Sequence, residues 1–253
     1  MFAKFNLSMS DQLFNVNDYV KEGKTQFAES KCAVQKALDQ YLRNDGTLDA
    51  AAIEADWFPQ VDTDIFISHS HKDEKLAISL AGYLAKNCHV SSFIDSTVWG
   101  YADELLKEIN DKYSRLNQPG KNGYEYAKVN RSAQQVYLLL QGALAKMINR
   151  CECLIFLNTP AAMHVSDIKD ENLTSSPWIY SELTMASTFP PRPYKDYRII
   201  DSYIRAEMNY NVCLDSFVDL SFSDIEKARN ETLIKGGPFF LDKLYENKGI
   251  LKR

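Results

Sequence analysis

The sequence has no long hydrophobic run, and none of its apolar stretches approaches the ~20 residues that a membrane-spanning helix needs. The segment from Met1 to Ser10 contains no sustained apolar core, so we expect no secretory signal peptide. The five cysteines show no framework spacing, which indicates a reducing compartment rather than a disulfide-stapled fold. These absences predict a cytoplasmic protein without a membrane partner.

Basic residues are outnumbered by acidic ones, and glycine is scarce. Lys and Arg number 29 against 34 Asp and Glu, and no basic stripe is visible, so we expect no nucleic-acid partner. None of the 10 glycines belongs to a GxGxxG turn. A dinucleotide would therefore bind as a substrate in a cleft and not as a Rossmann-type redox cofactor. At 253 residues the chain is long enough for one sizeable domain with extensions.

Three short segments, at residues 65–67, 90–94 and 153–157, share one pattern. Each indicates a strand that ends in small polar residues and leads toward a helical pattern, and the unbroken apolar runs at 65–67 and 153–157 predict burial on both faces of a parallel sheet. The carboxyl ends of parallel strands meet at one edge, where ligands bind in open α/β folds. The residues that we expect along this edge are Ser68, His69, Ser70, Asp95, Ser96, Asn158 and Thr159.

The helix expected after the third strand begins with Ser175-Ser176-Pro177, because Ser is a preferred N-cap and Pro suits the first helical position. Trp178 and Glu182 are four residues apart and share a face of this helix. The neighbouring apolar stripe should pack on the sheet, which places Glu182 at the rim of the buried face. A carboxylate beside an indole at the ligand edge is a reasonable catalytic constellation. The alternatives without a catalytic role are that Glu182 is a solvated glutamate near the start of a helix and that Trp178 is an aromatic side chain packed on the sheet.

Three motifs in this order resemble a Toll/interleukin-1 receptor (TIR) domain of the bacterial type: Asp64–Asp73, Phe93–Asp95 with Gly100 soon after, and Trp178–Leu183. The resemblance covers roughly residues 62–195. It implies a flavodoxin-like parallel sheet flanked by helices, and cleavage of NAD⁺ at the nicotinamide–ribose bond to linear or cyclic ADP-ribose products. It further implies a role in anti-phage defence of the Thoeris type, and homo-oligomers formed through TIR–TIR contacts.

The catalytic glutamate of the family corresponds to Glu182, and NAD⁺ is expected as a substrate with no cofactor. We expect the substrate pocket to contain Ser68, His69, Ser70, Asp95, Trp99, Asn158 and Trp178. A metal site is not expected, although His69 and His71 alternate as Cys151 and Cys153 do. The cysteines open a strand and the histidines follow one, so they should lie about a strand length apart, roughly 17–20 Å.

We expect an N-terminal helical extension over residues 1–60, a TIR domain over 61–220 and a C-terminal helical segment over 221–253. A helical insertion at about 111–146 and a polar, lid-like loop at 164–175 interrupt the middle segment. Alternating apolar residues predict a further strand at 208–214, and Ser223 with Glu226 predicts a capping box. The same pattern predicts a capping box at Ser70 and Asp73.

The first functional interpretation is an NAD⁺-cleaving glycohydrolase or cyclase that is weakly active until subunits associate. The alternative is a non-catalytic TIR module that signals by oligomerisation. A third, more remote interpretation is another flavodoxin-like enzyme that transfers glycosyl groups of nucleosides. The Trp178–Glu182 spacing favours an enzyme, because a scaffold has no need of it.

Overall fold

The structure is a computed structural model, and it describes residues 1–8, 17–30, 37–98, 102–116, 122–165, 172–197, 218–232 and 237–251. The chain forms two compact units. The first comprises Met1–Ser30, Asp62–Ile94 and Met147–Arg253, and the second comprises Lys31–Val61 and Asp95–Lys146. The units group the chain differently from the predicted segments 1–60, 61–220 and 221–253.

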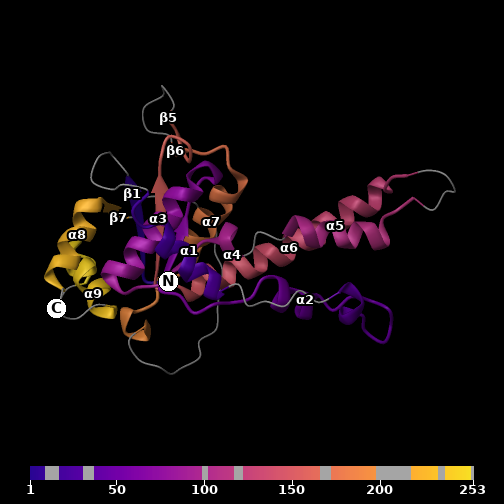
Figure 1. Cartoon of the computed structure of the whole chain (residues 1–253), viewed down its shortest axis with the longest axis horizontal. Helices are drawn as coiled ribbons and strands as arrows, with labels where there is room; N and C mark the ends of the chain where they lie inside the picture. The colour runs from indigo at the N-terminus through magenta and orange to yellow at the C-terminus, as the bar shows by residue number, and fades with distance from the viewer. Residues whose placement is uncertain are drawn as a thin grey trace. The chain divides into compact units, whose positions relative to one another are not determined.

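Five parallel strands form the central sheet of the first unit, in the spatial order β3-β2-β4-β1-β7 (Figure 1). The strands are β1 (Ala3–Ser8), β2 (Ile65–Ser68), β3 (Ser92–Phe93), β4 (Cys153–Asn158) and β7 (Val218–Leu220). β2 is buried throughout and β4 in all but its last residue, as continuous apolar runs in a parallel sheet require. This architecture, flanked by helices, confirms the predicted α/β class and is consistent with a flavodoxin-like fold.

The strand β1 corrects the expectation that the first 60 residues form a helical extension. It lies between β4 and β7, with Ala3 paired to Cys153 and Phe5 paired to Val218. Phe5 and Leu7 are fully buried. Polar Lys4 and Asn6 alternate with them, so the segment lacks the unbroken apolar run that identifies β2 and β4. The N-terminal residues therefore belong to the sheet, and only the helices that follow match the prediction.

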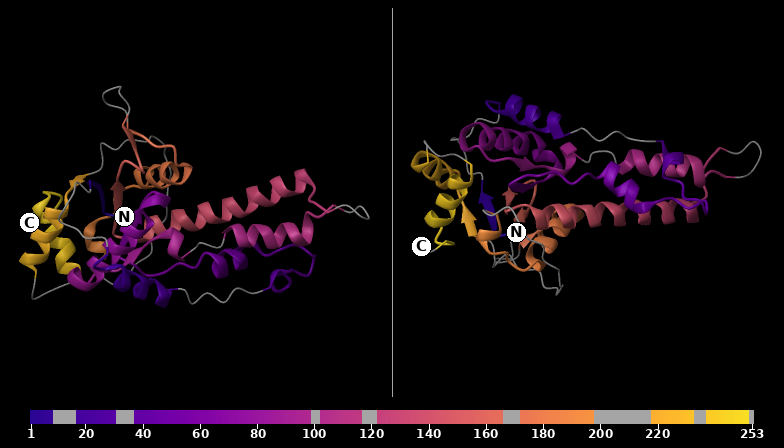
Figure 2. Two further views of the ribbon diagram at one scale, coloured as in Figure 1. Left: turned by 45° about the horizontal axis from the view of Figure 1, so that its top comes forward. Right: turned by 90° about the horizontal axis from the view of Figure 1, so that it is seen from below.

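The helices of the first unit form two layers around the sheet. They are α1 (Val20–Ser30), α3 (Glu74–Tyr83), α7 (Pro177–Thr188), α8 (Phe222–Glu231) and α9 (Pro238–Asn247). Helices α1 and α3 lie on one side of the sheet and α7 on the other (Figure 2). The predicted strand–turn–helix units after β2 and β4 are thus present, and they place their helices on opposite faces.

Two glycines let α1 and α3 pack backbone to backbone. A Cβ atom at Gly82 would lie 2.1 Å from the carbonyl oxygen of Tyr19, and one at Gly23 would lie 2.0 Å from that of Ile78. Real Cβ atoms essentially never come closer than 3.0 Å to such atoms. Neither glycine has a positive φ, so close approach and not backbone conformation requires glycine at both positions.

The second unit is helical. It contains α2 (Ala50–Trp57), α4 (Asp95–Val98), α5 (Ala102–Tyr113) and most of α6 (Tyr126–Arg150), which continues into the first unit from Met147. Asp49 caps α2 by accepting hydrogen bonds from the backbone N–H groups of the second and third residues that follow it. The helix predicted within the insertion at 111–146 is α6. The unit is larger than that insertion: its second segment begins at Asp95, and its first segment comprises Lys31–Val61.

Local predictions in the remaining segments have mixed outcomes. The loop at 164–175 contains a short antiparallel pair, β5 (His164–Val165) with β6 (Asn172–Leu173). The capping box predicted for Ser223 and Glu226 is wrong, because Ser221 and Asp224 form it. The strand predicted at 208–214 lies outside the described residues. Among the described residues, no helix is both long and apolar enough to span a membrane.

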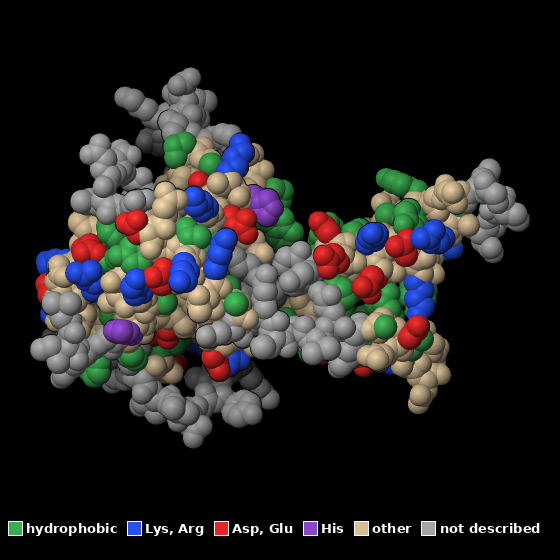
Figure 3. All heavy atoms as spheres, viewed as in Figure 1, with side chains coloured by type: hydrophobic (Ala, Val, Ile, Leu, Met, Phe, Trp, Pro, Cys, Tyr) green, Lys and Arg blue, Asp and Glu red, His purple; other side chains and the backbone are tan. Residues whose placement is uncertain are grey.

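Acidic and basic side chains are interspersed over the face of the molecule drawn in Figure 3, with hydrophobic patches between them. This distribution agrees with the modest net charge of −5. A uniformly basic face of the kind that binds nucleic-acid backbones is not visible in this view.

Candidate active site

The carboxyl ends of β2 and β4 form a topological switch point. These strands are neighbours, and Ser68 at the end of β2 pairs with Phe156, two residues before the end of β4 at Asn158. The chain leaves β2 toward β3 at one edge of the sheet, and it leaves β4 toward β7 at the opposite edge. Diverging connections of this kind open a crevice where ligands bind in α/β sheets. Ser68, His69, Ser70 and Asn158 therefore lie along one edge of the sheet, as predicted.

The polar residues at the end of β2 and directly after it are buried. Ser68, His69 and Ser70 are all buried. The hydroxyl of Ser70 accepts a hydrogen bond from the backbone N–H of Lys72 at 3.4 Å and caps the short helical turn His71–Asp73. The hydroxyl of Ser68 is buried and makes no hydrogen bond to any other described residue. A buried polar atom of this kind calls for a partner, and a ligand at the crevice would supply one.

A hydrogen bond joins the loops after β2 and β4 across the switch point. The hydroxyl of Thr159 donates to the carboxylate of Asp73 at 2.5 Å, and it accepts from the backbone N–H of Ala162 at 3.1 Å. The prediction that Asp73 completes a capping box with Ser70 is therefore wrong. Sequence analysis missed this link, because only the sheet topology places the two loops side by side.

Helix α7 supplies the candidate catalytic residue. Ser176 caps it by accepting from the backbone N–H of Ile179 at 3.3 Å, and Pro177 opens its first turn, as predicted. The helix packs against β2. Glu182 is only 3% exposed and belongs to the buried face of the helix, not merely to its rim.

Trp178 lies one helical turn before Glu182 and has a different environment. Its side chain is 38% exposed, whereas Glu182 is buried. The indole therefore does not pack into the core, which leaves its surface accessible at the N-terminal end of α7. Glutamate side chains are rarely buried in proteins, so the 3% exposure of Glu182 sets it apart from the exposed Trp178 on the same helix.

Two of the predicted site residues do not lie in the described part of the first unit. Asp95 is half-buried and begins α4, which belongs to the second unit. Trp99 lies outside the described residues. Their participation in the site stays a prediction.

The cysteines and histidines do not assemble into a metal site in the described part of the chain. No group of three or more His, Cys, Asp or Glu side chains there could hold a metal ion. Cys151 and Cys153 are buried at the start of β4. Burial raises the pKa of Cys151 to about 12 and the pKa of Cys153 well above its usual value. Both thiols are therefore neutral at physiological pH.

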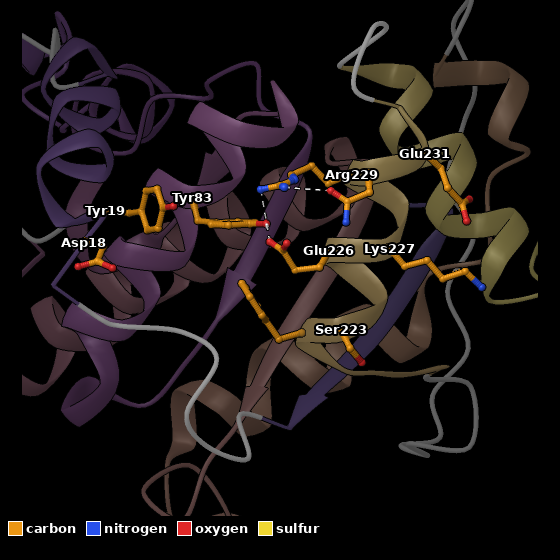
Figure 4. Close-up of a pocket in the computed structure, with 10 residues that line it drawn as sticks. Asp18, Tyr19, Tyr83, Ser223, Glu226, Lys227, Arg229 and Glu231 are labelled. Atoms are coloured by element: carbon orange, nitrogen blue, oxygen red, sulfur yellow. Dashed lines mark hydrogen bonds and ion pairs between the residues drawn. The ribbon is translucent and has the colours of Figure 1, made fainter.

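A pocket of about 700 Å³ lies elsewhere in the first unit, and none of the predicted site residues lines it (Figure 4). The ring of Tyr83 meets Tyr19 edge-on at 5.2 Å and lies 5.1 Å from the ring of Phe222. Glu226 pairs with Arg229 at 3.6 Å, so part of the charge in the wall is already neutralised. We assign no chemistry to this pocket.

Comparison with protein-family models, with curated proteins and with solved structures finds no match to this chain. The functional argument therefore depends on the chemistry of the residues at the switch point.

Proposed function

We propose that the protein cleaves NAD⁺ at the bond between nicotinamide and ribose, as a TIR-type glycohydrolase or cyclase. The observation that carries the proposal is the burial of Glu182 on the helix that packs against β2, the strand that ends at the polar switch point. A carboxylate held away from water stabilises a nearby developing positive charge more strongly than a solvated one does.

The chemistry needs one carboxylate. The bond between C1′ of the ribose and the ring nitrogen breaks, and its electron pair stays with nicotinamide, which leaves as a neutral molecule. The ribose gains oxocarbenium character, which Glu182 stabilises as carboxylates do in glycosidases. Water then attacks C1′ and loses a proton to give ADP-ribose, or a nucleophile of the same molecule attacks to give a cyclic isomer. Because nicotinamide leaves from a cation, no general acid is required.

The other residues have supporting roles in this proposal. Ser68, His69, Ser70 and Asn158 offer hydrogen bonds to the ribose hydroxyls and phosphates, with the unpartnered Ser68 hydroxyl foremost among them. Trp178 offers an exposed aromatic surface for a ring of the substrate.

The test is release of nicotinamide from NAD⁺ by the purified protein, followed by chromatography. Replacing Glu182 with Gln keeps the shape of the side chain and removes its charge, so we expect turnover to fall by ~10²–10³. The matched control is Glu152→Gln. Glu152 is 4% exposed in the same unit but precedes β4, at the amino edge of the sheet, so its variant should retain activity.

Circular dichroism of both variants separates loss of chemistry from loss of fold. Near-normal turnover in a folded Glu182→Gln protein would show that this residue is not the catalyst. No nicotinamide release by the wild-type protein at any concentration would remove the enzyme proposal altogether.

Association of subunits is the second candidate role, and exposed apolar side chains on α6 favour it. Tyr126 and Leu138 are 80% and 71% exposed. We propose that homo-oligomers form on activation and that the protein acts in the bacterial cytoplasm in anti-phage signalling. Light scattering alongside specific activity at increasing protein concentration tests this. Assembly without nicotinamide release would favour the scaffold, and full activity in a dilute monomer would argue against activation by association.

A further inference from the structure

A groove of about 610 Å³ is formed within the second unit, apart from the residues proposed for NAD⁺ cleavage. Three segments line it: the turn at 46–48 with the start of α2, the end of α5 with the residue that follows it, and the first half of α6. Its volume lies in the range of small-molecule sites, roughly 300–1,000 Å³. All of its lining residues belong to one unit, so the groove is a property of that unit alone.

The base of the groove is apolar. Ile53, Ile109 and Val136 line it and are buried in the unit. Two hydroxyls also lie there, but they satisfy each other: Ser114 and Ser132 are buried, with their Oγ atoms 3.4 Å apart. Ser132 also donates to the carbonyl oxygen of Lys128 at 3.0 Å. The base therefore suits a ligand with a hydrocarbon body, because the polar groups of the base already have partners and need no hydrogen bonds from the ligand.

The charge of the groove is one-sided. Its lining includes two cations, Lys128 and Arg131, and no acidic residue, although the whole chain carries a net charge of −5. Lys128 is paired with Glu125 at 2.7 Å. Arg131 is exposed, and among the described residues it makes no ion pair or hydrogen bond. A guanidinium presents a planar fork of N–H donors that matches a carboxylate bidentately.

We propose that this groove binds a single-chain amphiphile with an anionic head, namely a long-chain fatty acid. The hydrocarbon chain lies along Ile53, Ile109 and Val136, and the carboxylate pairs with Arg131. Charge complementarity selects this ligand: a neutral lipid would leave Arg131 unused, and a cationic one would be repelled. The site is independent of the proposed NAD⁺ chemistry.

The test uses the full-length protein and the fluorescent fatty acid cis-parinaric acid. We expect saturable binding that palmitate displaces and that hexadecanol, a neutral molecule of the same chain length, displaces at least about ten-fold more weakly. Arg131→Ala should weaken binding about ten-fold or more. Lys107→Ala removes the same charge from an exposed position on α5 that does not line the groove, and it should bind like wild type.

A second variant tests the body of the groove. Ala50 is exposed at the start of α2 and lines the groove, so Ala50→Trp should fill it and abolish binding without disturbing the core. The proposal is overturned by any of three results: no saturable binding, equal displacement by hexadecanol, or unchanged affinity in both groove variants. Self-association of the protein that excludes the probe would also overturn it, because the groove would then be an interface between copies.

Discussion

Gly82→Ala is a sharp test of the packing between α1 and α3. In an exposed helix the substitution should stabilise the protein by up to ~1 kcal/mol, because alanine has the higher helix propensity. Here the new Cβ would lie 2.1 Å from the carbonyl oxygen of Tyr19 and 2.6 Å from the backbone nitrogen of Gly23. Both atoms are backbone, so no side chain can move aside, and the two helices must separate.

The magnitude follows from the distance. Relief of the clash requires a shift of about 1 Å, and overpacking of this kind typically costs about 1–3 kcal/mol, occasionally more. We therefore expect the sign of the propensity effect to reverse, with a net loss of about 1–3 kcal/mol. For a chain of this size that corresponds to about 2–4 °C of Tm per kcal/mol.

The assay is urea unfolding followed by far-ultraviolet circular dichroism, and the matched control is Gly142→Ala. Gly142 lies within α6, and a methyl group added there would have a carboxylate oxygen of Glu54, at 4.0 Å, as its nearest neighbour. Alanine there should raise stability by about 0.5–1 kcal/mol. A Gly82→Ala protein that is as stable as wild type or more so would refute the close packing of the two helices.

Two further predictions concern buried groups. Burial lowers the pKa of Lys4 below 10.5, so the charged form of this residue destabilises the fold. Lys4→Met should therefore raise the free energy of unfolding at neutral pH, and this gain should shrink as the pH approaches 10.5. Lys24→Met, at an exposed position, should change the free energy of unfolding little. An unchanged or lowered stability of Lys4→Met would show that the ammonium has an adequate partner. Burial raises the pKa of Cys88, Cys151 and Cys153, so iodoacetamide should label them at about pH 8 at least about 100-fold more slowly in the folded protein than after denaturation, as measured by peptide mapping. Rapid labelling of the native protein would contradict their burial.

The parts of the fold that sequence analysis predicts correctly are those whose signals are local. Unbroken apolar runs identify β2 and β4, and Ser176 with Pro177 identifies the start of α7. The strand β1 escapes such an analysis because its partners in β4 and β7 are distant in sequence and because Lys4 and Asn6 interrupt its apolar residues.

In the candidate site, too, local sequence signals predict some features, whereas others depend on contacts between segments that are distant in sequence. Strand ends predict that Ser68 and Asn158 lie along one edge of the sheet, and the register of β2 with β4 agrees with this. Helical spacing places Glu182 near the sheet but only at the rim, and its full burial depends on how α7 sits against β2. The bond between Thr159 and Asp73 joins two loops, and nothing in either loop alone predicts the partner.

The position of β1 in the sheet constrains the order in which the protein can assemble during synthesis. β1 emerges first from the ribosome, but its neighbour β4 begins only at Cys153. At ~5–20 residues per second, β1 must wait on the order of ten seconds for a partner, with its apolar side chains exposed. Among the described strands, β7 pairs with β1 and no other, so β7 can dock only after β1 has joined the sheet. Removing the first eight residues would therefore detach β7 as well as β1, and a fusion that occludes the N-terminus during synthesis should trap the nascent chain in an open, aggregation-prone state.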